Sequence, residues 1–218
     1  MPAGAIEKAT LSDRVTRALR DSIVSGELPA GSPLKQEELA GRFGISMGAL
    51  REALRTLHSD GLVTIFPNRG ALVSDLASGE AEEIFDIRTF LELGALELAL
   101  PRLTEKELTA AVKICDRMDN PRDAARWAEM NRELHETLYA PARRPKLLAL
   151  IRNLHDNVSR YMRLYLDTLN FQEKSQNEHR ALIEACRTGD GPAARDLLRG
   201  HLTAAREQLV QYLRERDN

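Results

Sequence analysis

The chain has 218 residues, of which 43% are hydrophobic, and a formal net charge of −2. That length suits a globular protein of one large or two small domains, and the charge argues against strong, indiscriminate binding to nucleic acid. No run approaches the roughly 18 apolar residues that a membrane span needs, and the first residues lack the apolar segment of a secretory signal. Cys115 and Cys186 lie far apart on apolar helix faces, so we expect reduced thiols in a cytoplasmic protein.

The first part of the chain carries the pattern of a helix-turn-helix. Apolar residues at helical spacing predict a helix over 11–23, and a break rich in proline follows it. Residues 39–43 and 49–57 fit two further short helices. Gly44 lies at the turn between them, where glycine tolerates an unusual backbone shape, and Ser46 supplies an N-cap oxygen for the second helix.

Basic residues on the second of these helices predict contact with DNA. Arg51 and Arg55 fall away from its apolar stripe, where they can meet phosphates or base edges in a major groove, and His58 is expected to be exposed or near phosphate. Residues 1–75 nevertheless contain nine Lys and Arg and nine Asp and Glu. A DNA-binding surface must therefore come from placement, with moderate affinity for each domain and two domains acting together.

A short hairpin is expected after the second helix. Residues 62–66 are β-branched and aromatic enough for a strand, residues 67–70 form a turn, and residues 71–74 can return as a second strand. Three helices with this two-stranded wing make a winged helix. Arg69 at the tip is either a solvated loop charge or a contact to phosphate or the minor groove, and its position favours the contact.

The remainder of the chain has only helical patterns. Residues 75–79 are short and polar, and they mark the predicted boundary between a domain of residues 1–75 and a domain of residues 76–218. The six predicted helices begin near Ser78, Thr104, Pro121, Pro145, Glu173 and Pro192, with a capping box at Thr104 and Glu107. Helices joined by short loops form antiparallel bundles. The expected fold is mainly α, a winged helix-turn-helix followed by a six-helix bundle.

Several polar residues interrupt the apolar stripes of this bundle. Asn131 and His135 are one turn apart on one predicted helix, and His179 and His201 lie at inward or border positions of two others. A lone histidine there is usually a core imidazole bonded to a neighbour. Three of them on separate helices, together with the asparagine, indicate one divalent metal site, because bundle interiors often hold metals. His155 has no such partner and is interpreted as structural.

The proposed ligands are neutral, which has a consequence for what else binds. Three imidazoles and an amide oxygen leave the charge of a divalent ion uncompensated, so an anion, most simply a carboxylate, is expected at any open position. Arg88 is on the inward side of the first bundle helix, where an unpaired guanidinium is costly. It either binds that anion or forms a buried salt bridge, for example to Glu92.

Two sets of motifs in the right order resemble the GntR family of bacterial transcription regulators. The winged-helix motifs are LKQEELAGRFGIS, LREAL, DGLV and PNRGALV. The later part resembles the all-helical ligand-binding domain of the FadR subgroup, called FCD, and six bundle helices rather than seven favour its VanR-like branch. The resemblance covers roughly residues 11 to 213.

This resemblance implies a homodimer that binds a palindromic double-stranded operator and changes its grip when a small organic acid enters the helical domain. The family's metal motif corresponds to Asn131, His135, His179 and His201, with zinc as the expected ion and nickel or another transition metal as alternatives. The effector is expected next to Arg88 and Asn177. The predicted DNA-contacting residues are Lys35, Ser46, Met47, Gly48, Arg51, Arg55, Asn68, Arg69 and Gly70.

The sequence departs from the family at its DNA surface. Members usually read Ser-Arg-Thr-Pro-Val-Arg-Glu-Ala-Leu at the recognition helix, and here Met47 replaces the first arginine while Arg51 matches the second. Glu37 stands where an arginine is common on the preceding helix. Loss of an arginine contact to guanine costs about 1 to 3 kcal/mol, so we expect an unusual operator or weaker binding.

Three functions remain open from the sequence. A regulator controlled by a metabolite explains both halves of the chain. A metal-responsive regulator without an organic effector is the first alternative. A metalloenzyme is the second, since three histidines with an open position also suit hydrolysis. No carboxylate stands out near the four proposed ligands as a general base, and an enzyme would leave the winged helix without a role.

Overall fold

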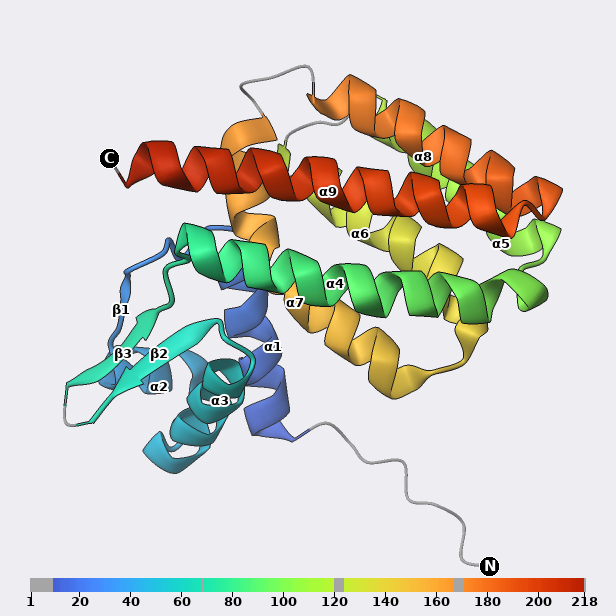
Figure 1. Cartoon of the computed structure of the whole chain (residues 1–218). Coiled ribbons are helices and arrows are strands. Elements are labelled where there is room, and N and C mark those ends of the chain that lie inside the picture. The colour runs from blue at the N-terminus through green and yellow to red at the C-terminus, as the bar shows by residue number, and fades with distance from the viewer. Residues whose placement is uncertain (1–9, 68, 120–123, 167–170, 218) are drawn as a thin grey trace, which may run out of the picture. The chain divides into compact units, whose positions relative to one another are not determined.

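The computed structural model describes residues 10–67, 69–119, 124–166 and 171–217. The chain forms two compact units, Met1–Asp75 and Leu76–Asn218, which are described separately below (Figure 1). The first is a winged helix-turn-helix and the second a bundle of helices, so the predicted fold class is confirmed. Within the described ranges, no helix has both the length and the hydropathy needed to cross a membrane.

The first unit is built from three helices, α1 (Leu11–Val24), α2 (Gln36–Phe43) and α3 (Met47–Ser59). Gly44 ends α2 in the left-handed region, with φ of 62°, which allows the tight turn that the sequence predicts. Ser46 is the N-cap of α3, and its Oγ accepts a hydrogen bond of 3.2 Å from the Ala49 backbone N–H. The helix-turn-helix is therefore held by local chemistry.

The wing has three strands, whereas the sequence predicted two. Strand β1 (Pro33–Leu34) and strand β2 (Val63–Phe66) both pair antiparallel with β3 (Gly70–Val73), in the order β1-β3-β2. The proline-rich segment before α2 was interpreted only as a break in the chain. Pro33 lies at the edge of the sheet, where proline is tolerated, and Leu34 is buried beneath the wing.

The second unit contains six α-helices and two single turns of 3-10 helix among the described residues. They are α4 (Ser78–Ala99), η1 (Leu100–Arg102), α5 (Glu105–Met118), α6 (Ala124–Tyr139), η2 (Ala140–Ala142), α7 (Pro145–Leu166), α8 (Phe171–Thr188) and α9 (Gly191–Arg216). The predicted number of bundle helices is confirmed, as is the capping box of Thr104 and Glu107. The N-cap of α4 is Ala77 rather than Ser78. Pro121, predicted to open α6, lies outside the described residues.

Ion pairs show that α9 runs antiparallel to α4. Arg195, near the start of α9, pairs with Glu97 near the end of α4, and Arg214, near the end of α9, pairs with Glu82 near the start of α4. Helix α8 leads into α9 through a tight turn at Gly189 and also runs antiparallel to it (Figure 1). Helices α4 and α8 therefore begin at the same end of the bundle.

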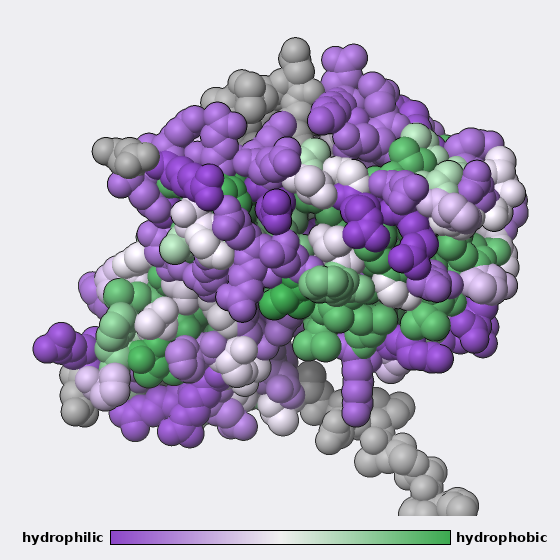
Figure 2. Space-filling model, in the orientation of Figure 1, coloured by the Kyte–Doolittle hydropathy of each residue, from purple (hydrophilic) through white to green (hydrophobic). Residues whose placement is uncertain are grey.

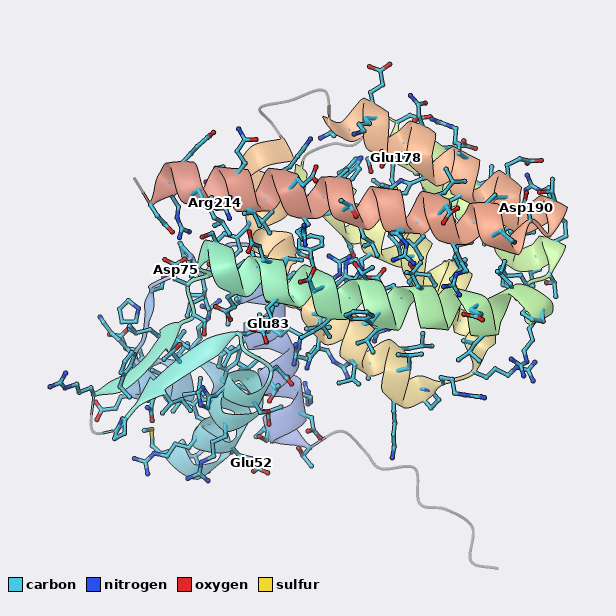
Figure 3. The ribbon with its side chains drawn as sticks, in the orientation of Figure 1. Glu52, Asp75, Glu83, Glu178, Asp190 and Arg214 are labelled. Atoms are coloured by element: carbon cyan, nitrogen blue, oxygen red, sulfur yellow. The ribbon has the colours of Figure 1, made fainter. Side chains whose placement is uncertain are left out.

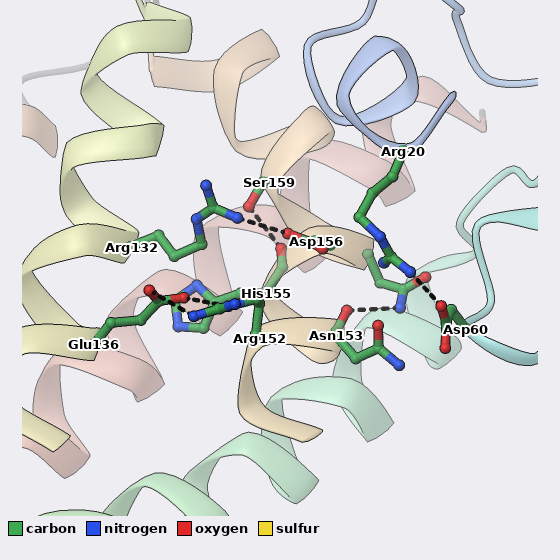
Figure 4. Close-up of polar contacts among 10 residues, drawn as sticks. Arg20, Asp60, Arg132, Glu136, Arg152, Asn153, His155, Asp156 and Ser159 are labelled. Carbon is green, nitrogen blue, oxygen red and sulfur yellow. Dashed lines mark hydrogen bonds and ion pairs between the residues drawn. The ribbon is translucent and has the colours of Figure 1, made fainter. Parts of the chain in front are cut away.

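Two further ion pairs hold α7 against α6 in an antiparallel arrangement. Arg132 contacts Asp156, and Arg152 makes a bidentate pair with Glu136, with N–O distances of 2.7 and 3.0 Å (Figure 4). The turn η2 before α7 packs against the end of α4 and its following turn η1, so α7 is also antiparallel to α4. Helices α4, α6 and α8 thus share one direction, opposite to α7 and α9.

Candidate metal centre and DNA-contact surface

Three histidines from three helices converge inside the bundle. His135 on α6, His179 on α8 and His201 on α9 offer nitrogen atoms that all lie within 4.8 Å of one another. Their ring centroids are 4.7 to 5.3 Å apart, and all three side chains are buried. Residues far apart in the sequence therefore present imidazoles to one point, as their spacing predicted.

Each imidazole is held through its Nδ1 atom. His135 Nδ1 donates to the hydroxyl of Tyr139 at 3.1 Å, because that hydroxyl itself donates to the Glu92 carboxylate at 2.9 Å. His201 Nδ1 donates to the Glu178 carboxylate at 2.8 Å; Glu178 is labelled in Figure 3, between α8 and α9. These bonds place the proton on Nδ1 and leave the lone pair on Nε2, the arrangement usual for metal-binding histidines.

Gln176 fixes the third imidazole in the same way. Its amide nitrogen donates to the Cys115 carbonyl at 2.8 Å and to Asp119 Oδ1 at 2.9 Å. Its amide oxygen is therefore turned toward His179 Nδ1, which donates to it at 3.2 Å. Because the amide can be placed in only one of its two orientations, the tautomer of His179 follows from the network.

Several buried acceptors on two of the helices that carry these histidines have no hydrogen-bond donor among the described residues. Asn131 Oδ1, His135 Nε2 and His179 Nε2 all lack a partner among the described residues. A buried acceptor without a donor costs about 1 to 3 kcal/mol, so a cluster of them is unfavourable unless a cation binds there. Three imidazole nitrogens and one amide oxygen match the usual ligands of zinc and its neighbours. The residues present therefore fit a divalent metal ion.

Burial keeps the His135 and His179 imidazoles in the form that binds a metal. It lowers the pKa of His135 well below the usual value, and the nearby His201 lowers it further. Burial, with His201 and His135, likewise holds the pKa of His179 well below its usual value. Both rings are therefore neutral at physiological pH, with no proton to displace from the Nε2 atom that faces the centre.

Arg88 is buried next to the centre in an ion pair that the sequence left as one of two alternatives. Its Nε donates to Glu92 at 2.8 Å, its Nη2 donates to His155 Nε2 at 2.8 Å, and its guanidinium lies over the Phe85 ring at 4.7 Å. Burial alone would raise the pKa of Glu92, but Arg88 and His155 hold it well below its usual range. Arg88 Nη1 still has no partner among the described residues, so one donor remains for an anion.

Asn177 is not at the centre. It is exposed on α8, two residues from His179 and so about 200° around the helix. It lines a surface groove of about 430 Å³ together with Glu173, Lys174 and Glu178. Asn177 therefore does not face the histidines, and its place beside an effector stays a prediction.

Sequence reasoning missed three residues that orient the ligands. Tyr139 is one turn after His135, and Gln176 is three residues before His179, so helical spacing alone could have suggested both. Glu178 is different. Glu178 on α8 contacts His201 on α9, and only the relative rotation of these two helices brings the two side chains together.

The predicted DNA surface is exposed in the first unit. Arg51 and Arg55 on α3 and Arg69 on the wing are exposed, and no ion pair or hydrogen bond engages their guanidinium groups within the described ranges. Arg51 and Arg55 are one turn apart, on the same side of α3 as Glu52, which Figure 3 labels. A recognition helix needs such a free basic face.

The other predicted DNA contacts differ in their availability. Lys35 is exposed but pairs with Glu38 at 2.9 Å, and Ser46 Oγ already caps α3. Met47 is half-buried against the core of the unit, as an apolar replacement for arginine would be. Gly48 is exposed, Gly70 takes the positive φ of 91° that starts β3, and Asn68 lies outside the described residues.

Comparison with known proteins matches both units. Residues 11–73 match the bacterial regulatory proteins of the gntR family, and residues 83–204 match the FCD domain. The chain is 27% identical over 201 residues to YdhC of Bacillus subtilis (strain 168), an uncharacterized HTH-type transcriptional regulator, with 90% of each chain covered. It is 27% identical over 199 residues to the HTH-type transcriptional repressor GlaR of Escherichia coli (strain K12), covering 85% of this chain and 90% of GlaR.

A solved structure supports the fold. That of E. coli McbR/YncC has a TM-score of 0.79 at 22% sequence identity, covering 97% of this chain and 100% of that one. The assignment to the VanR-like branch stays a prediction. The relatives are transcription regulators rather than enzymes, and the predicted winged helix-turn-helix is present. The chain is a DNA-binding transcription regulator and belongs to the GntR family, in the group that carries an FCD domain.

Proposed function

We propose that a small carboxylate, bound at a divalent metal ion in the bundle, controls how this regulator grips its operator. The observation that carries the proposal is the convergence of His135, His179 and His201, together with unsatisfied acceptors at His135 Nε2, His179 Nε2 and, one turn before His135 on α6, Asn131 Oδ1. Structural core histidines would be satisfied on both nitrogens. Among the described residues, His135 and His179 are hydrogen-bonded through Nδ1 only, which is the arrangement that supports a metal.

Zinc is the metal that these donors favour, with nickel or another transition metal as alternatives. Three imidazole nitrogens and one amide oxygen are donors that zinc accepts, imidazole also suits nickel and copper, and such an ion can take one ligand beyond these four. When bound, the ion supplies positive charge and an open coordination position. Tyr139, Gln176 and Glu178 orient the three imidazole rings through hydrogen bonds to their Nδ1 atoms.

Charge counting favours an anion beside the ion. A divalent ion and Arg88 bring three positive charges, and the buried Glu92 and the groove-lining Glu178 offset two of them. One positive charge is left without a partner, and Arg88 Nη1 is a buried donor without an acceptor among the described residues. A monocarboxylate would neutralise the charge and accept from Nη1 in one step.

The same count of charges also supports one alternative function, a metal sensor without an organic effector. Because Glu92 and Glu178 already offset most of the positive charge, the ion could be retained without an organic anion. The chain would then be a metal sensor, and loading the ion alone would change its affinity for DNA. The two functions differ in one observable, the response of the metal-loaded protein to carboxylic acids.

A homodimer is the assembly that a palindromic operator requires, and the bundle offers a surface for it. Ile87 and Phe90 on α4 are 40% and 79% exposed, and Leu150 on α7 is 55% exposed. Figure 2 shows apolar surface gathered over the middle of these two helices. Large exposed apolar side chains in one area are typical of protein contacts. We name Ile87, Phe90 and Leu150 the apolar patch.

Charges at the two ends of the apolar patch are arranged for self-pairing. Glu83 is one turn before Ile87 on α4, and Lys146 is one turn before Leu150 on α7. Because α4 and α7 are antiparallel, these opposite charges lie at opposite ends of the patch. Two copies related by a two-fold axis would bring the acidic end of one against the basic end of the other.

Control of DNA binding then requires two dimer states that the ligand distinguishes. A ligand shifts such an equilibrium only by its difference in affinity for the two states, and about 5.5 kcal/mol moves it from 1:99 to 99:1. An anion that completes the coordination of a buried ion and pairs with Arg88 in one state alone is a source of that difference.

The test begins with selection of binding sites from random duplexes by the full-length protein. Fluorescence anisotropy on the selected duplex then compares metal-loaded protein, metal-loaded protein with a panel of carboxylic acids, and chelated protein. The proposal expects a palindromic site and a change of at least tenfold in Kd with one acid, which chelation abolishes. A change with metal alone supports the sensor, and no change with either removes ligand control.

A further inference from the structure

Three buried hydrogen-bond donors in the bundle lack acceptors. Arg88 Nη1, Trp127 Nε1 and Ser175 Oγ have no partner in the part of the chain that the structure describes. The side chains of Trp127 and Ser175 are fully buried, and Arg88 is 3% exposed. The orphaned acceptors near the histidines fit a cation, whereas these donors need oxygen atoms. A metal ion alone therefore leaves these three donors unexplained.

Two of the three donors lie on the same side of the histidines. Trp127 is two turns before His135 on α6, and Ser175 is one turn before His179 on α8. Helices α6 and α8 run in the same direction, so each step toward the N-terminus leads toward the same end of the bundle. Arg88 is one turn before Glu92, which bonds Tyr139 one turn beyond His135, so Arg88 is near the level of the histidines. Trp127 and Ser175 therefore extend from the histidines toward that end, while Arg88 stays beside them.

Trp127 is directly adjacent to the candidate metal centre. Its ring stacks on the His179 ring, with 6.4 Å between centroids and an interplanar angle of 29°. Trp127, Asn131, His135 and Tyr139 follow one another at four-residue spacing and form one row along α6. Along this row the polar groups change from a hydroxyl that orients His135, through two acceptors, to an indole donor.

Packing alone does not account for these donors. A phenylalanine would fill much of the Trp127 position and an alanine much of the Ser175 position without an unsatisfied N–H or O–H group. Each buried donor without an acceptor destabilises the fold unless something accepts from it. Gln208 Oε1, an acceptor on α9 two turns beyond His201, also lacks a partner among the described residues.

We propose that Trp127 and Ser175 form a second subsite, which binds an oxygen atom at the far end of the effector. The effector class is then a short carboxylic acid that carries a hydroxyl or carbonyl oxygen beyond its carboxylate. This inference rests on the proposed function, in which the carboxylate itself lies between the metal and Arg88. Trp127 and Ser175 determine specificity, since an acid without the far oxygen leaves both donors unsatisfied.

Isothermal titration of the metal-loaded, full-length protein tests the subsite. The probes are butyrate, 3-hydroxybutyrate and 4-hydroxybutyrate, which share a carboxylate and differ in the far hydroxyl. One hydrogen bond contributes about 1 kcal/mol, so at least one hydroxy acid should bind about fivefold or more tightly than butyrate. Trp127→Phe and Ser175→Ala should each reduce that preference while butyrate affinity and metal content stay unchanged.

The matched control is Ser159→Ala. Ser159 is also a buried serine of the bundle, but its Oγ already donates to the His155 carbonyl at 2.6 Å (Figure 4), so its loss should not alter the preference. Circular dichroism and metal content establish that each variant is folded and loaded. Should Trp127→Phe fail to fold, Ser175→Ala alone decides, because it removes one atom.

Two results would overturn the subsite. One is wild-type protein that binds butyrate as tightly as both hydroxy acids, and the other is a preference that survives both substitutions. In either case the carboxylate still binds and the proposed function stands. Failure of the proposed function looks different: metal-loaded protein binds none of the three acids, and the subsite is then overturned with it.

Discussion

The two units of this chain treat their polar residues in opposite ways. In the winged helix, every buried side chain that the structure describes is apolar, and the arginines predicted to meet DNA are exposed. In the bundle, buried arginine, glutamate, asparagine and histidine side chains converge on one region. Substitution of an exposed functional residue leaves the packing of the core unchanged. Substitution of a buried functional residue also affects the stability of the fold. The expected effects of substitution therefore differ between the units.

The largest expected effect is the loss of the metal from a variant of the bundle. His179→Ala removes one of three imidazoles and should lower the bound metal from about one ion per chain to a small fraction, measured by elemental analysis. The control is His58→Ala in the winged helix, where the histidine bonds the Val63 carbonyl and lies outside the bundle. Equal metal content in both variants would contradict the difference between the units.

In the winged helix, Arg51→Ala is expected to have a large effect on DNA affinity. Loss of an arginine contact to a base costs about 1 to 3 kcal/mol, which corresponds to about 5- to 150-fold in Kd for the selected duplex. Metal content should not change, because the residue is exposed on α3. The exposed Arg117→Ala of the bundle is the matched control, and a similar loss of DNA affinity there would show that general charge, not the recognition helix, governs binding.

A smaller effect, on metal affinity, is expected from a residue that hydrogen-bonds one of the metal ligands. Glu178→Gln keeps the shape of the side chain but weakens its hydrogen bond to His201, and such partners contribute about 10- to 100-fold to metal affinity. We expect the lower end of that range, because Glu178 is partly exposed in its groove. The control is Glu173→Gln, which changes another residue of the same groove, one that contacts no histidine within the described ranges. A competition titration with a chelator should give this control the metal affinity of the wild type.

The smallest effect is expected at Gly48 on the reading surface. A methyl group there would meet only Ser46 Oγ, at 3.8 Å, and alanine favours helix over glycine by up to about 1 kcal/mol. Gly48→Ala should therefore raise the Tm of the winged helix by a few degrees and leave metal content unaffected. A lower Tm would mean that this surface is constrained by packing in the same way as the bundle core.

The fold could be predicted where neighbouring residues determine it. The helix-turn-helix follows from apolar spacing, the glycine at 44 and the cap at Ser46, all local features. Strand β1 was missed because Leu34 pairs with Ala71, a distant partner that no local pattern indicates. The same division holds within the site. Helical spacing placed Asn131 and His135 together, but the Glu178 contact with His201 depends on how two helices are rotated.

Arg88 shows what a sequence leaves undecided. Its inward position and its spacing to Glu92 were both visible, yet an anion site and a salt bridge were equally compatible with them. The structure contains the ion pair and also an unpaired Nη1, because one carboxylate and one imidazole do not saturate a guanidinium. The two interpretations are therefore compatible, which only the geometry of the donors reveals.

Anomalous X-ray diffraction from crystals of the metal-loaded protein tests the central claim most directly. The account expects one anomalous peak in the bundle of each chain, bonded by the Nε2 atoms of His135, His179 and His201 and by Asn131 Oδ1, with every Nδ1 still on its present partner. A peak elsewhere, or none at the histidines in protein that binds metal, would contradict it.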